Sequence, residues 1–145
     1  MKVDFWQLSR DPAEKVVALI AARVLASGER LLVVSRDPAQ REAISRELWH
    51  APPAESFLAN GEASAPGAER QPILLSETAE PANQASHVIY ADGEFRGADG
   101  FARAFLLFDE ASLTAARATW RSLDGLDALE RAFFRQDGGK WTKVA

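Results

Sequence analysis

The chain has 145 residues, of which 47% are hydrophobic and 26% are charged, a composition typical of one soluble globular domain with a real core. Its formal net charge of −4 argues against unaided tight binding to DNA, and the absence of cysteine excludes disulfides and thiolate metal sites. No apolar run approaches the ~20 residues of a membrane span and the polar start is not a secretory signal, so we expect a cytoplasmic protein without membrane contact. We expect residues 1–145 to form a single domain with a flexible loop at about 59–71.

The first fifty residues predict the order strand, helix, strand, helix. Short β-rich runs at 3–8 and 31–34 are each followed by the pentapeptide SRDPA, at 9–13 and 35–39, and each copy precedes apolar residues at helical spacing. The repeat indicates two similar strand-to-helix junctions rather than a duplication. This order is typical of a parallel sheet covered by helices.

Local signals predict where these two helices begin and end. In each copy of the pentapeptide an aspartate suits the N-cap and a proline suits the first helical position, namely Asp11 with Pro12 and Asp37 with Pro38. Gly28 is expected to stop the first helix, because glycine readily adopts the left-handed conformation that follows a helix end.

The elements after residue 58 are predicted from composition and spacing. Turn-forming residues over 59–71 predict a surface loop, and the apolar runs 72–76 and 87–91 predict buried strands. Phenylalanines at i, i+4 and i+7 after Asp99 predict a helix, and a further helix is expected at about 110–123.

The end of the chain is expected to form a last strand pair around Asp137-Gly138. Together these elements predict an α/β fold with three layers, α/β/α, in which a mostly parallel sheet resembles that of nucleotide-binding proteins. The glycine-rich phosphate loop of such proteins is missing. The first strand-to-helix turn reads SRDP, where Asp11 would repel phosphate and Pro12 removes an amide donor.

No residue pattern in the sequence indicates an active site. The histidines are His50, which suits a helix end, and His87, which we interpret as a structural residue opening a strand. The carboxylates of Asp92, Glu94 and Asp99 fall in one loop and are interpreted as a solvated turn. We therefore expect no catalytic residue, no metal and no cofactor.

The expected helix over 113–124 carries an aromatic residue flanked by two arginines. Its core-facing stripe consists of Leu113, Ala116, Trp120 and Leu123. Arg117 lies at the edge of this stripe and Arg121 follows one turn later, a like-charge pair that costs only about 0.2–0.5 kcal/mol and that a bound anion would relieve. Such a group suits a peptide that carries carboxylates and an apolar side chain. The alternative is a core tryptophan with both arginines solvated or paired to Asp124, Asp109 or Glu110.

A second aromatic surface is predicted in the segment 46–57, RELWHAPPAESF. Trp49 falls in the last turn of a helix, and two prolines then force an extended exit toward Phe57. Large aromatic residues on a rigid connection are common anchors of protein–protein contacts. The alternative is that both rings close the end of the core between helix and sheet.

Several segments, in their order and spacing, resemble the chi subunit of bacterial DNA polymerase III holoenzyme from residue 3 to about residue 143. The matching segments are VDFWQL, LLVVSRDPAQREAISRELW, SFLANG, QPILLS, FARAFLLFD, AARATWR and the final GGKW. The resemblance implies a non-catalytic accessory subunit of the replicative clamp loader with an α/β fold. It also implies two partners, the psi subunit and the acidic C-terminal tail of single-stranded DNA-binding protein, so that DNA is contacted indirectly.

The resemblance further implies roles for individual positions. Arg117 matches the family's arginine for the terminal carboxylate of the tail, Trp120 an aromatic residue lining the pocket, and Arg121 a basic residue facing the tail's acidic groups. Trp49 and Phe57 match an aromatic pair associated with psi binding.

The sequence departs from the family pattern beside the expected tail pocket. A basic residue one turn before Arg117 is replaced by Leu113, so we expect this pocket to be weaker or to be extended by Arg103 or Arg135. Two other functions remain open at this point: a nucleotide-dependent enzyme of the same fold class, and a module that binds single-stranded DNA directly.

Overall fold

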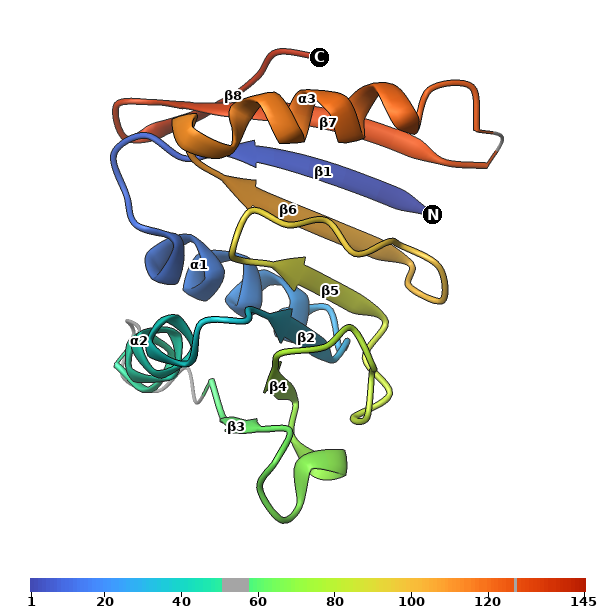
Figure 1. Ribbon diagram of the computed structural model, residues 1–145. Coiled ribbons are helices and arrows are strands. Elements are labelled where there is room, and N and C mark those ends of the chain that lie inside the picture. Colours follow the sequence, from blue (N-terminus) through green and yellow to red (C-terminus); the bar gives the residue numbers. More distant parts are fainter. Residues whose placement is uncertain (51–57, 127) are drawn as a thin grey trace.

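The computed structural model describes residues 1–50, 58–126 and 128–145, which form one eight-stranded sheet with helices on both faces (Figure 1). The strands and helices are β1 (Lys2–Gln7), α1 (Ala13–Ala26), β2 (Leu31–Val34), α2 (Pro38–Trp49), β3 (Asn60–Glu62), β4 (Ile73–Ser76), β5 (His87–Tyr90), β6 (Arg103–Phe108), α3 (Leu113–Ser122), β7 (Glu130–Asp137) and β8 (Lys140–Lys143). Short 3₁₀ helices occur at Ala68–Arg70 and Glu110–Ser112.

The strand order is β3-β4-β2-β5-β6-β1-β7-β8. All neighbouring strands from β3 to β7 are parallel, and β8 alone pairs antiparallel, with β7. The predicted α/β fold with a mostly parallel sheet is therefore confirmed.

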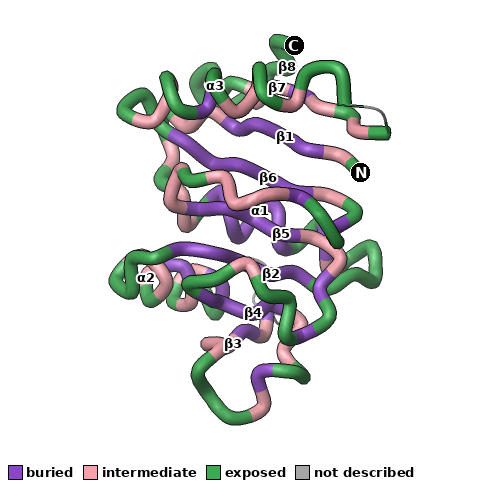
Figure 2. The backbone as a smooth tube through the Cα atoms, turned by 45° about the vertical axis from the view of Figure 1, so that its right-hand side comes forward, coloured by how far each residue is buried: buried purple, intermediate pink, exposed green. Residues whose placement is uncertain are grey.

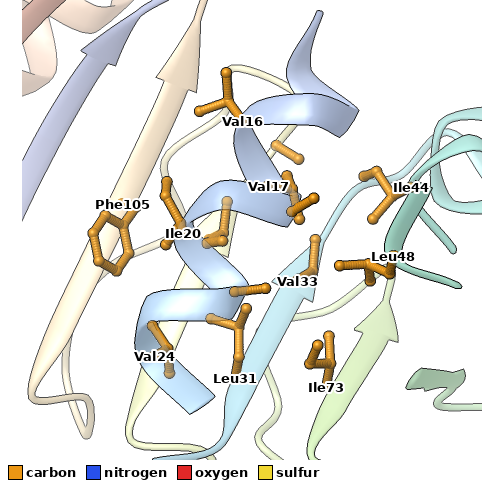
Figure 3. Close-up of a cluster of buried hydrophobic side chains, with 14 of the residues drawn as sticks. Val16, Val17, Ile20, Val24, Leu31, Val33, Ile44, Leu48, Ile73 and Phe105 are labelled. Carbon is orange, nitrogen blue, oxygen red and sulfur yellow. The ribbon is translucent and has the colours of Figure 1, made fainter. Parts of the chain in front are cut away.

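Two hydrophobic clusters lie on opposite faces of the sheet. On one face, α1 and α2 pack against alternate strand residues, and Figure 3 shows Val17 and Ile20 of α1 beside Val33 of β2 and Phe105 of β6. On the other face, α3 and the loops after β4 and β5 cover the remaining strand residues. Figure 2 shows buried residues along the central strands and exposed residues on α2 and α3. With helices on both faces of the sheet, the three-layer arrangement is confirmed.

The junction after β2 follows its sequence prediction, whereas the junction after β1 does not. Asp37 is the N-cap of α2, its carboxylate accepts from the Ala39 amide at 2.9 Å, and Pro38 is the first helical residue. By contrast α1 begins at Ala13 with Pro12 at its N-cap and no side-chain cap. The prediction that Asp11 caps α1 is wrong, because its carboxylate accepts from the Gln136 side chain instead.

The helix predicted after Asp99 is a strand, β6. Its residues alternate between the two hydrophobic clusters, so that Phe105 faces α1 while Leu106 and Phe108 face the other side. A central parallel strand is apolar on both faces, and its continuous apolar run imitates helical spacing.

The segment 59–71 is more regular than predicted. It contains β3, which pairs with β4, and Asn60 is buried with its side chain bonded to Ser45. The prediction of a loop over the whole segment is therefore wrong at 60–62.

The remaining predicted boundaries agree with the structure to within a few residues. The strands at Ile73–Ser76 and His87–Tyr90 and the helix at Leu113–Ser122 lie where expected. Gly28 follows the end of α1 with a φ of +83°. The final strand pair turns at Gly138, whose φ of +63° suits the tight turn of a hairpin.

Candidate functional site

Helix α3 presents its apolar stripe to the sheet as the sequence predicts. The Asp109 side chain accepts from the Ser112 amide at 3.1 Å and so starts the helical segment. Ala116 is buried, and the partly buried residues packed against the same cluster include Leu113, Trp120 and Leu123.

The indole of Trp120 is partly buried and rests on two phenylalanines of the sheet. It meets Phe5 of β1 edge to face with ring centres 5.2 Å apart, and Phe133 of β7 in the same way at 5.8 Å. These contacts fix the ring, while its remaining exposure leaves part of it accessible to another molecule.

Arg117 and Arg121 are both exposed on the outer side of α3. Neither forms an ion pair with any carboxylate in the described part of the chain, and Asp124 is paired with Arg131 at 3.0 Å. The alternative in which these arginines pair with Asp124, Asp109 or Glu110 is therefore wrong, whereas the alternative in which they are solvated agrees with their exposure. The structure leaves two exposed guanidinium groups, one turn apart, on the helix that carries the partly buried indole of Trp120.

Arg131 belongs to this surface although the sequence analysis did not single it out. Its guanidinium carbon lies 4.2 Å from the centre of the Trp120 ring, and its Nη1 donates to the Trp120 carbonyl oxygen. Alternation along β7 could have placed Arg131 on the same face as Phe133. The contact with Trp120 could not be predicted, because Arg131 lies in a different element of the sequence from α3.

The two arginines considered as extensions of the tail pocket lie on different faces of the sheet. Arg135 lies on the same face of β7 as Phe133 and is half exposed. Its Nε is 3.5 Å from Oδ1 of Asp137. Arg103 lies on the α1 face, where it pairs with the buried Asp4 carboxylate and covers the Phe105 ring at 4.9 Å. The expectation that Arg103 extends a pocket on α3 is therefore wrong.

Trp49 is the last residue of α2, on the sheet face opposite to α3. Its side chain is 57% exposed, whereas Ile44 and Leu48 of the same helix are buried in the core. The alternative that Trp49 closes the end of the core is therefore wrong. Phe57 lies outside the described residues.

The carboxyl ends of the central strands border a cleft of about 450 Å³, at the place where related folds bind nucleotides. Its lining includes the carboxylate residues Asp11, Asp92 and Asp109. The buried Gln136 side chain holds the loop after β1. Its Oε1 accepts hydrogen bonds from the amides of Arg10, at 3.0 Å, and Asp11, at 3.1 Å. The amides of Arg10 and Asp11 are thus bonded internally, and the cleft is lined by negative charges.

Asp92 is not part of a solvated turn, contrary to the prediction. The Arg96 guanidinium donates two hydrogen bonds to the Asp92 carboxylate, at 2.9 and 2.6 Å, and the Arg36 amide donates a third at 2.9 Å. Burial on its own would raise the pKa of Asp92, but these bonds outweigh it and hold the pKa below the ordinary value. The network ties the β5–β6 connection to the start of α2.

The histidines occupy structural positions. His50 Nδ1 lies 2.7 Å from the Arg46 carbonyl at the end of α2, as expected for a residue interacting with terminal carbonyls. His87 lies 2.8 Å from the Ser86 hydroxyl, and burial lowers its pKa. Over residues 1–50, 58–126 and 128–145, no group of three or more His, Asp or Glu side chains could hold a metal ion.

The family model described as DNA polymerase III chi subunit, HolC, matches residues 1–128. The chain belongs to this family. A comparison with curated proteins gives no match. Membership makes the chain an accessory subunit of DNA polymerase III, as the resemblance implied.

The match to the chi family includes α2 and α3, while β7, which carries Arg131, and β8 lie beyond residue 128. None of the helices in the described segments is both long and apolar enough to cross a membrane.

Proposed function

We propose that this chi-family subunit is a non-catalytic adaptor of the clamp loader, acting in the cytoplasm. Through the psi subunit it would link the polymerase to the acidic C-terminal tail of single-stranded DNA-binding protein. Arg117 would take the terminal carboxylate of the tail, Trp120 its aromatic side chain, and Arg121 its acidic groups.

One observation carries the tail proposal: Arg117 and Arg121 are exposed, and no ion pair within the described chain uses either. In a protein of net charge −4, two such cations one turn apart favour an anionic partner. Arg131 supports the proposal because it holds Trp120 in place before any peptide arrives, which reduces the entropy lost on binding.

The proposal for psi binding rests on Trp49. An indole that is 57% exposed at the end of a rigid helix is a suitable anchor for a partner subunit. Because α2 and α3 cover opposite faces of the sheet, the two partners could bind at the same time.

The two rival functions receive less support from the geometry. Acidic residues line the cleft at the nucleotide position, and Gln136 accepts from the amides of Arg10 and Asp11 in the loop after β1, which disfavours a nucleotide-dependent enzyme. Net negative charge disfavours direct binding of single-stranded DNA. Calorimetry with common nucleotides, and anisotropy with naked against protein-coated oligonucleotide, separate these functions from the adaptor.

The test of the adaptor is a comparison of two single variants against both partners. Arg117→Ala should abolish binding of the tail peptide and leave psi binding unchanged, whereas Trp49→Ala should weaken psi binding and leave the tail docked. Arg70→Ala is the matched control, since Arg70 is exposed and remote from both helices along the chain. Equal loss of both partners, or of neither, in the Arg117 variant would contradict separate sites.

A further inference from the structure

The sheet ends at a strand whose outer edge is open. In the strand order β8 is the terminal strand, and it pairs only with β7 among the described residues. Figure 1 shows it at the end of the sheet next to β7. The opposite edge, β3, has three residues and is shorter than β8.

The hairpin register decides which backbone groups of β8 face outward. In a hairpin with a two-residue turn, the pair next to the turn, Asp137 and Lys140, exchanges hydrogen bonds, and bonded pairs then alternate with unbonded ones. The bond from the Val144 amide to the Phe133 carbonyl, at 2.8 Å, fits this alternation, which ends there because the Phe133 amide donates to the Ala145 carbonyl at 3.1 Å. The N–H and C=O groups of Trp141 and Lys143 therefore point away from β7, toward the open edge.

Trp141 keeps this edge in place. Its ring packs against Trp6 of β1 with ring centres 4.7 Å apart, so the edge strand is anchored to the core of the α1 face. An edge that is already ordered loses little conformational entropy when another strand pairs with it.

The charge around β8 is positive although the whole chain is acidic. Residues 113–145 contain six Lys or Arg and four Asp or Glu, against a net charge of −4 for the chain. Lys140 and Lys143 are exposed and no ion pair in the described chain involves them. The Arg10 guanidinium lies close to the hairpin turn. Its Nη1 is 3.3 Å from the position that a Cβ atom on Gly139 would occupy.

The two lysines oppose pairing of β8 with a second copy of itself. In an antiparallel pair centred on the strand, Lys140 of each copy would face Lys143 of the other, and like charges directly opposite destabilise a strand pair. The same two charges would attract an acidic strand. Because Lys140 and Lys143 are three positions apart, they project to opposite faces of the sheet.

We propose that the open edge of β8 is a docking site for an extended acidic segment of another protein, which adds to the sheet as a further strand. Backbone bonds to Trp141 and Lys143 hold the segment, and two acidic side chains three positions apart pair with Lys140 and Lys143. This site goes beyond the adaptor function and does not depend on Arg117 or on a free terminal carboxylate.

The probe is an octapeptide, Thr-Val-Asp-Val-Thr-Glu-Val-Thr, acetylated and amidated so that it carries no terminal charge and cannot use a terminal-carboxylate site on α3. Titrated into the full chain, it should slow hydrogen exchange of the Trp141 and Lys143 amides and leave that of Thr142, already bonded to β7, unchanged. Protection elsewhere, or none, would overturn the proposal.

N-methylated peptides separate strand addition from simple charge attraction. Two versions carry methyl groups on alternate residues, in opposite phases, so that only one phase removes the donors that face β8. That version should bind at least about fivefold more weakly for each donor removed, and the other should keep its affinity. Equal binding or equal loss in both versions would contradict strand addition.

Charge reversal tests the preference for acidic segments. The double variant Lys140→Glu with Lys143→Glu should lose at least about tenfold in affinity for the acidic peptide and gain affinity for its lysine counterpart. Lys15→Glu with Arg23→Glu, at two exposed positions of α1, changes the net charge by the same amount and should change neither affinity. Arg117→Ala should bind the octapeptide normally; a loss there would assign the peptide to α3 and overturn the proposal.

Discussion

The guanidinium group of Arg131 lies over the Trp120 indole, with its central carbon 4.2 Å from the ring centre, and it also donates a hydrogen bond to the Trp120 carbonyl oxygen. One side chain from β7 thus fixes both the ring and the last turn of α3. Helix α3 otherwise buries only Ala116 completely, so this contact is important for holding the helix on the sheet.

Replacing Arg131 should loosen α3. Arg131→Met keeps much of the apolar stem but removes the cation–π contact with Trp120 and the hydrogen bond to the Trp120 carbonyl. We therefore expect the free energy of unfolding to fall by about 1–2 kcal/mol. Denaturant titration measures this change, and the Trp120 indole N–H resonance should shift. Arg135→Ala, on the same face of β7 and half exposed, is the control and should change stability by no more than about 0.5 kcal/mol. An Arg131 variant as stable as wild type would contradict this role.

Trp49 should matter for binding and not for folding. Because its side chain is 57% exposed, Trp49→Ala should change the free energy of unfolding by less than about 0.5 kcal/mol while it weakens psi binding. Leu19→Ala, at an exposed leucine of α1, should leave psi binding intact. A Trp49 variant that melts early would show that the ring packs against the fold after all.

Gln136 should be a strong contributor to stability. Gln136→Ala leaves the amides of Arg10 and Asp11 without their acceptor in a part-buried loop, so we expect a loss of about 1–3 kcal/mol. Hydrogen exchange at these two amides should accelerate well beyond that of the α1 interior. Unchanged exchange would mean that the loop is held by other contacts.

The Asp92 network should make stability depend on pH in the acid range. The folded pKa of Asp92 is lowered from the reference value of 3.8, so in the acid range the Asp92 side chain binds fewer protons in the folded than in the unfolded chain. Its contribution is complete above the unfolded pKa and is lost as the pH falls through the folded pKa. Asp92→Asn should therefore destabilise the chain at pH 7 and flatten the fall in stability below about pH 4. Parallel pH profiles of variant and wild type would contradict this account.

Local chemistry was predictable from the sequence where neighbouring residues decide it. Asp37 caps α2 as expected because the N-cap, the proline and the helix lie within a few residues. The stripe that contains Ala116 and Trp120 follows in the same way from helical spacing. Such features need no knowledge of what packs against them.

Features set by distant pairing were not predictable in this way. Phe105 was assigned to a helix because burial of β6 on both faces removes the alternation that marks a strand. Arg131 and Gln136 act through the pairing of β7 with β1, in which Phe133 lies opposite Phe5, and nothing near them in the sequence indicates that register. Asp11 does not cap α1 for the same reason, because its carboxylate accepts a hydrogen bond from Gln136 of β7.

Arg117 and its neighbours on α3 are proposed to receive the charged end of another chain. Titration of the full chain with an acidic peptide ending in phenylalanine, beside the same peptide amidated at its C-terminus, tests this claim most directly. We expect the free carboxylate form to bind in a salt-sensitive way and the amidated form to bind at least about tenfold more weakly, because a charge-assisted bidentate pair is lost. Equal affinity for the two peptides would contradict the account.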